Sequence, residues 1–193
     1  MRVGIIADGQ AESQALGFLV ERMRSSGCLP LKPLYADMQP YAPPAQIVRA
    51  SESRIKVLAQ KSAERFIVLL DREQNEACPG VFAQTLQAAY QGHGYLNVSV
   101  VIKNRCFENW LIGDPAALRG IGGRNRVDVS DRILERIRAS GADGVNGLAV
   151  LNGCIKDGYC KRSDAIEICK RIDPQVVAAN SRSFRKFVKV LSN

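Results

Sequence analysis

The chain has 193 residues, 46% of them hydrophobic, which is enough to bury a full core and fits one domain better than two. It carries a formal charge of +8, and its six cysteines are scattered without the spacing of a zinc site. Its apolar runs are too short to span a membrane, and its N-terminus lacks the pattern of a signal peptide. We therefore expect a cytoplasmic protein with reduced cysteines, no membrane partner and a single domain over residues 1–193.

Strands and helices are predicted to alternate through the first hundred residues. Short apolar runs predict strands at residues 2–7, 31–36, 66–70 and 97–103. Apolar residues at helical spacing predict helices between them, near residues 16–23, 48–59 and 82–90. This βαβαβαβ order is typical of a Rossmann-like α/β fold, in which helices flank both faces of a mostly parallel sheet.

Beyond residue 105 the pattern changes to helices. A short helix is expected within FENWLIG, followed by a helix start at Asp114-Pro115. Later helices are expected near residues 133–137, 165–172 and 184–191. The glycine-containing stretch 120–147 between them is predicted to be a mobile loop or a small insertion. We therefore divide the domain into a core, residues 1–115, and a helical extension, residues 116–193, that packs on the same sheet.

Acidic side chains follow two of the predicted strands. Asp71 and Glu73 end the apolar run FIVLL, and side chains two apart in an extended segment point to the same side. Asp8 follows the first strand and Glu12 lies one helical turn later, so both are expected near the same edge of the sheet. Crowded carboxylates in a basic protein favour a hard divalent cation, Mg²⁺ or Mn²⁺. The alternative is that these acids are turn residues or helix caps.

These acidic motifs resemble those of TOPRIM-like domains, the module shared by topoisomerases, primases and OLD-type nucleases. Such domains have Glu-Gly after the first strand and Asp-x-Asp after a later one. The sequence IIADGQAE puts Asp8 and Gly9 on the first motif, with Glu12 on a second acid that several members keep, and LLDRE puts Asp71 and Glu73 on the second motif. At these positions the chain differs from the usual motif: Asp8 occupies the position of a glutamate, and Glu73 occupies the position of an aspartate.

The resemblance is closer to a bacterial family of uncharacterised TOPRIM-like proteins, through CFENWLIGDP, YCKRSDAIEI and SRSFRKFVKVL, and it covers most of the chain. It implies that Asp71 and Glu73, with Glu12 or Asp8, hold one or two Mg²⁺ or Mn²⁺ ions. It also implies that the acid after the first strand is a general acid or base. A role in phage defence beside a partner ATPase is implied as well.

Other candidate site residues lie after the fourth predicted strand and in the late basic segment. Glu108 is a candidate metal ligand or general base, or else a first-turn carboxylate that favours the helix dipole. Five cations are expected to bind nucleic acid, by their place at a strand end or by the resemblance: Lys103, Arg105, Lys156, Lys161 and Arg162. Each is alternatively an ordinary surface charge. The positive net charge favours such a polyanionic partner.

Together these features predict a nuclease that hydrolyses phosphodiester bonds of nucleic acid with Mg²⁺. The alternative is a non-catalytic TOPRIM-like module that binds nucleic acid or a partner protein, which the two altered acids would permit. A phosphoacceptor receiver domain fits less well, because the sequence has no adjacent acid pair after the first strand and Lys103 follows the fourth strand rather than the fifth.

Overall fold

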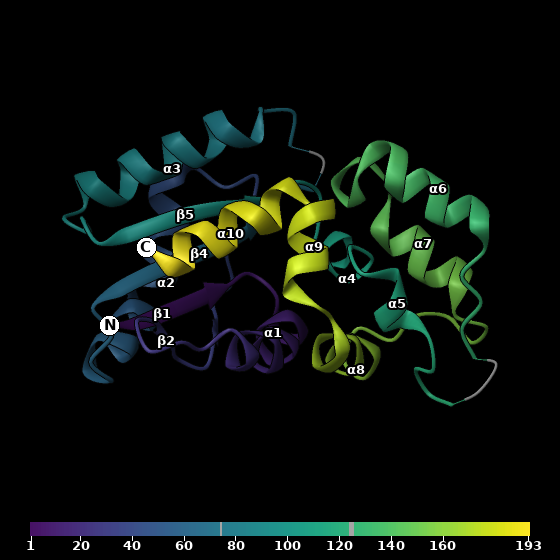
Figure 1. The fold of residues 1–193 in the computed structure, drawn as a ribbon. Helices are drawn as coiled ribbons and strands as arrows, with labels where there is room; N and C mark the ends of the chain where they lie inside the picture. The colour runs from purple at the N-terminus through teal and green to yellow at the C-terminus, as the bar shows by residue number, and fades with distance from the viewer. Residues whose placement is uncertain (74, 124–125) are drawn as a thin grey trace.

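The protein has one five-stranded sheet between layers of helices (Figure 1), in a computed structural model that describes residues 1–73, 75–123 and 126–193. The strands are β1 (Arg2–Ala7), β2 (Leu29–Pro30), β3 (Leu34–Tyr35), β4 (Arg65–Asp71) and β5 (Val98–Lys103). All their pairings are parallel. The expected Rossmann-like α/β fold with a mostly parallel sheet is therefore confirmed.

The second predicted strand differs from the structure, because residues 31–36 do not form one continuous strand. Two short strands take its place, and both pair with β1: Leu29 is the partner of Arg2, and Leu34 is the partner of Ile6. Pro30 and Pro33 have no N–H group to donate to a ladder, so proline here favours a short, interrupted edge over a continuous strand.

The strand order is β2-β1-β4-β5, with β3 also beside β1. The chain therefore builds outward from β1 in one direction through β2 and β3, and in the other direction through β4 and β5. The carboxyl ends of β1 and β4 lie side by side where the order reverses, since Ala7 pairs with Leu69. In open parallel sheets this switch point is where ligands bind.

Helices cover both faces of the sheet and continue into a second group beside it (Figure 1). Those of the first half are α1 (Gln10–Arg22), α2 (Pro44–Gln60) and α3 (Pro79–Gly92). Those of the second half are α4 (Glu108–Leu111), α5 (Pro115–Leu118), α6 (Asp131–Ser140), α7 (Gly147–Cys154), α8 (Asp164–Arg171), α9 (Pro174–Asn180) and α10 (Arg182–Ser192), with a 3₁₀ turn, η1 (Ala142–Gly144). Within the described ranges, no helix is both long and apolar enough to cross a membrane.

Two hydrophobic clusters fill the space on either side of the sheet. One joins side chains of α2 and α3 to the sheet face that carries Val68 and Leu70. The other joins the face that carries Ile67 and Leu69 to α1 and to buried residues of every helix from α4 to α10. The helices after residue 105 therefore share one hydrophobic cluster with this face of the sheet; α10 covers β5 directly, and α6 and α7 lie beside the sheet (Figure 1).

Trp110 anchors the second of these clusters. Its ring is fully buried, stacks on Phe187 at 5.3 Å between ring centroids and meets Phe184 edge-on at 5.0 Å. Its indole N–H donates to the Ser183 hydroxyl at 2.8 Å, so the one polar atom of the ring is also satisfied. Trp110 of α4 thus ties α10 to the carboxyl end of the sheet.

In the described part of the stretch 120–147, α6 lies where the sequence predicts a helix near residues 133–137, and η1 follows it. Ile137 and Ala142 are buried in the core, so this part packs on the rest of the protein and does not form one long loop. Residues 124 and 125 lie outside the described residues. Gly141, with a φ of 69°, ends α6 in the left-handed region that favours glycine.

Gly147, the first residue of α7, allows the close approach of α4. A Cβ added at Gly147 would lie 2.7 Å from both Asn109 N and Glu108 C, which are backbone atoms. We expect Gly147→Ala to destabilise the fold by about 1–3 kcal/mol, because the backbone of α4 has to move. Gly153→Ala, in the same helix but with open space around it, is expected to stabilise by about 0.5–1 kcal/mol. Denaturant unfolding of both variants checks this, and equal shifts would contradict it.

Candidate metal centre

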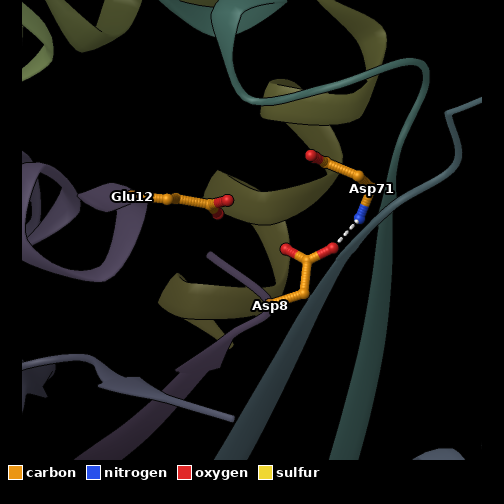
Figure 2. A group of neighbouring side chains, drawn as sticks. All are labelled: Asp8, Glu12 and Asp71. Carbon is orange, nitrogen blue, oxygen red and sulfur yellow. Dashed lines mark hydrogen bonds between the residues drawn. The ribbon is translucent and has the colours of Figure 1, made fainter. Parts of the chain in front are cut away.

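Three carboxylates meet at the switch point of the sheet (Figure 2). Asp8 directly follows β1, Glu12 lies in the first turn of α1, and Asp71 is the last residue of β4. Each offers one oxygen, and these three oxygens lie within 4.8 Å of one another. The structure therefore brings together both acids predicted after the first strand and the first acid of the later motif.

Backbone geometry fixes the spacing of these acids. The backbone N–H of Asp71 donates to Asp8 Oδ2 at 2.6 Å, which links the ends of β1 and β4 (Figure 2). Gly9 separates Asp8 from α1, and a Cβ at Gly9 would meet Glu12 Oε2 at 3.3 Å and Glu12 Cβ at 3.1 Å. The glycine therefore leaves room for the Glu12 side chain to turn back toward Asp8.

Lys103, the last residue of β5, lies among the three carboxylates. Its ammonium is 2.5 Å from Glu12 Oε2 and 2.8 Å from both Asp8 Oδ1 and Asp71 Oδ1. Lys103 and Asp71 are register partners on β5 and β4, so their side chains lie on one face of the sheet. The Lys103 side chain is fully buried, so this cation, predicted to bind nucleic acid, instead neutralises the acidic cluster.

Burial and neighbouring charges shift the pKa values of Glu12, Asp71 and Lys103. Burial raises the pKa of Glu12 well above its ordinary value, and the negative charges of Asp8 and Asp71 add to the rise. The pKa of Asp71 is raised by burial and by Asp8, against the opposing effect of Lys103. Burial lowers the pKa of Lys103, but the three carboxylates outweigh it and hold that pKa well above its ordinary value. The Lys103 ammonium is therefore charged, and its single positive charge does not neutralise all three carboxylates.

The side chains fit a hard divalent cation. Three carboxylates and one ammonium leave a formal surplus of two negative charges, 3 − 1 = 2. Glu12 Oε1 is buried without a hydrogen-bond partner, and so is Asp71 Oδ1, which is close to the Lys103 ammonium but outside hydrogen-bonding geometry. Two buried oxygens with lone pairs to spare in an all-oxygen donor set are what Mg²⁺ and Mn²⁺ bind.

Glu73 does not join the cluster, contrary to the expected geometry. The strand ends at Asp71, and Glu73 takes a left-handed backbone conformation with a φ of 51°. Its N–H donates to Arg105 O at 2.8 Å, and its side chain is exposed. Side chains two apart share a side only while the backbone is extended, so the turn after Asp71 removes Glu73 from the site.

Glu108, the first residue of α4, is a buried carboxylate near the cluster. Its side chain is 4% exposed and its Oε1 is 3.2 Å from the Lys161 ammonium. The charge of Glu108 also contributes to the raised pKa of Asp71, so the two carboxylates are electrostatic neighbours. Glu108 therefore keeps its place as a candidate general base, with Lys161 as its counterion.

The remaining predicted cations are at the surface. Arg105, Lys156 and Arg162 are exposed, and within the part of the chain that the structure describes none of them contacts the three acids. Lys161 is 62% exposed along its side chain, so it faces solvent while it pairs with Glu108. Besides Lys103, Lys161 is therefore the predicted nucleic-acid cation that the described structure connects to the site.

These features define a class: a parallel α/β protein with a buried carboxylate cluster, neutralised in part by a lysine, at the switch point of its sheet. The chain belongs to the family described as domain of unknown function DUF4276, which matches residues 9–192. The match includes Glu12, Asp71 and Lys103 and begins one residue after Asp8. Neither the curated proteins nor the solved structures gave a match to this chain.

Proposed function

We propose that this protein hydrolyses phosphodiester bonds of nucleic acid with Mg²⁺ or Mn²⁺. The observation that carries the proposal is the set of three carboxylates at the switch point, with two buried oxygens that lack hydrogen-bond partners. A purely structural cluster would be expected to satisfy Glu12 Oε1, which has no hydrogen-bond partner in the described structure while Oε2 of the same side chain pairs with Lys103, because an unpaired buried carboxylate oxygen is costly.

Different side chains of the site have different roles in this proposal. Asp8, Glu12 and Asp71 would hold the ion, which when bound supplies positive charge to a phosphoryl oxygen and acidifies a water. Lys103 keeps the carboxylates together when no ion is present. Glu108, buried and next to the cluster, is the candidate to accept a proton, and Lys161 holds its carboxylate in place.

The resemblance to TOPRIM-like domains supports the same chemistry. It matches Asp8-Gly9 and Asp71 to the acidic motifs of those domains, and these residues lie within or next to the cluster. The resemblance also points to a role in phage defence with a partner ATPase, a cytoplasmic location is a separate part of the proposal, and the charge of +8 favours nucleic acid as the substrate. Phage defence, the partner ATPase, the location and the substrate are therefore all parts of the proposed function.

One observation favours a second candidate, a non-catalytic module that binds nucleic acid or a protein partner. The Lys103 ammonium already contacts all three carboxylates, so the cluster has an internal cation. If that ammonium is never displaced, the cluster only stabilises the fold. The two candidates differ in whether divalent ions bind.

Incubation with labelled single-stranded and double-stranded RNA and DNA tests the proposal. We expect cleavage with Mg²⁺ or Mn²⁺, none with EDTA, and a loss of about a hundredfold or more in Asp71→Asn. Glu73→Gln, a matched change of an exposed acid two residues away, is expected to cleave like the wild type. Cleavage that persists in EDTA or in Asp71→Asn would refute the assignment, and no cleavage of any substrate would favour the non-catalytic module.

A further inference from the structure

A second pocket lies at the outer edge of the sheet, beyond β5. It has a volume of about 820 Å³ and lies between β5 and the starts of α3 and α10, with η1 at one end. β5 is the last strand of the sheet, so this edge has no neighbouring strand. The volume is within the range of pockets that hold ligands the size of a nucleotide.

Positive charge surrounds this pocket. Arg182, Arg185 and Lys186, all from the first turns of α10, line it, and all three are exposed. Among residues 1–73, 75–123 and 126–193, none of these three side chains has an ion-pair or hydrogen-bond partner. Three unpaired cations that line one pocket favour an anionic ligand.

The one carboxylate in the described lining does not offset that charge. Asp143 of η1 is 8% exposed and turned into the protein. Its Oδ1 accepts hydrogen bonds from the hydroxyls of Ser181 and Ser183, and its Oδ2 accepts one from the Ser183 N–H. A ligand in the pocket therefore faces the guanidinium and ammonium groups rather than a carboxylate.

The pocket reaches the same end of the sheet as the acidic cluster. Asn104, which lines the pocket, is the residue directly after Lys103. Its side chain donates to Asp143 O at 2.8 Å, and its carbonyl accepts from Arg72 Nε at 2.8 Å. Lys103 thus lies in the acidic cluster, and the next residue, Asn104, lines the pocket. This adjacency favours one ligand that extends over both sites.

We propose that this pocket binds phosphate groups of a nucleic-acid strand whose scissile bond lies at the acidic cluster. The assignment of the strand rests on the proposed function, whereas phosphate binding rests on the pocket alone. A free nucleotide carries the same chemistry, and competition between the two ligands distinguishes them. Duplex ends enter only if their strands separate, because the pocket is of single-ligand size.

The first test is binding in EDTA, so that it needs no metal ion. The probe is a labelled single strand of about ten nucleotides, read by fluorescence anisotropy. Replacing Arg182, Arg185 and Lys186 together by glutamine is expected to weaken binding by roughly tenfold or more and to reduce the salt dependence. The control replaces Arg49, Lys56 and Lys61, which are exposed on or beside α2, by glutamine, with the same change in net charge.

The second test uses Cys78, which lines the pocket and is exposed. Its pKa is lowered because its sulfur accepts hydrogen bonds from the backbone N–H groups of Gly80 and Val81. The triple variant is the control for this measurement. A bound strand is expected to slow alkylation of Cys78 in the wild type and to slow it much less in the triple variant, measured by mass spectrometry.

These results separate the possible ligands. If the strand binds more tightly than ATP in competition, the pocket is assigned to nucleic acid. If ATP binds more tightly, the strand assignment is overturned in favour of a free nucleotide. Equal binding by the triple variant, its control and the wild type, or unchanged alkylation of Cys78, would overturn phosphate binding. Because this binding needs no metal, its loss in the triple variant supports the pocket even when the wild-type protein cleaves none of the nucleic acids.

Discussion

Lys103→Met is expected to destabilise the metal-free protein by about 3–5 kcal/mol, the usual effect of removing one partner from a buried charge cluster. For a chain of this size the melting temperature then falls by roughly 6–20 °C. The cause is that three carboxylates lose the only ammonium within 2.8 Å of them in the described structure.

The stability of the metal-free protein is also expected to depend on pH. Burial raises the pKa values of Glu12 and Asp71, so near neutral pH the folded protein binds more protons than the unfolded chain. The free energy of unfolding therefore declines as the pH rises from the ordinary carboxyl pKa toward the raised values.

Divalent ions are expected to restore much of this loss. At a concentration about one hundred times its Kd, Mn²⁺ adds about 2.7 kcal/mol of stability to a protein that binds it only when folded. Calorimetric melting of Lys103→Met with and without Mn²⁺ measures this rescue. Lys161→Met is the control: its ammonium pairs with one buried carboxylate, that of Glu108, and its own side chain is 62% exposed, so a smaller loss of about 1–3 kcal/mol is expected. A Lys103→Met protein as stable as the wild type would contradict the role given to this lysine.

Asp71→Asn is expected to abolish the stabilisation that Mn²⁺ gives to the wild type. Asn keeps the shape of Asp71 but lacks the negative charge, and loss of a charged ligand lowers metal affinity by more than the roughly 10- to 100-fold seen when a ligand's own partner is removed. Glu73→Gln is the matched change at an exposed side chain outside the cluster, and it is expected to leave metal binding intact.

The increase in melting temperature on addition of Mn²⁺ measures this difference. At about one hundred times the Kd we expect roughly 5–11 °C for the wild type and for Glu73→Gln, and no increase for Asp71→Asn. Comparing each variant with itself removes any direct effect of the substitution on stability. If Glu73→Gln lost the increase as Asp71→Asn does, the metal site would follow the sequence motif rather than the geometry described here, and if Asp71→Asn kept the increase, the acidic cluster would not be the metal site.

Much of the fold could be predicted from periodicity. Strands β1, β4 and β5 lie where apolar runs predict them, because strands buried on both faces read as continuous hydrophobic segments. The two short strands between residues 29 and 35 could not be predicted from the sequence. Each pairs with only a part of β1, and that pairing depends on the position of β1 in the folded protein rather than on a local pattern. Within residues 120–147, apolar spacing predicted α6, whereas the 3₁₀ turn η1 has no such spacing and was not predicted.

Less of the candidate site could be predicted. Asp8, Glu12 and Asp71 were found because carboxyl ends of parallel strands meet at one edge, which is a rule of topology. The position of Lys103 required the register of β5 against β4, which pairs it with Asp71 and which no local pattern encodes. Glu73 was misplaced because the motif was read as extended, whereas a left-handed turn begins directly after the strand.

The central claim is that the carboxylates of Asp8, Glu12 and Asp71 bind a divalent cation in competition with the Lys103 ammonium. Calorimetric titration of Mn²⁺ and Mg²⁺ into the wild-type protein tests it most directly, since it needs neither a substrate nor a variant. We predict saturable binding of one or two ions by the folded protein. Absence of binding for both ions would contradict the claim and would leave Lys103 as the permanent counterion of a structural acidic cluster.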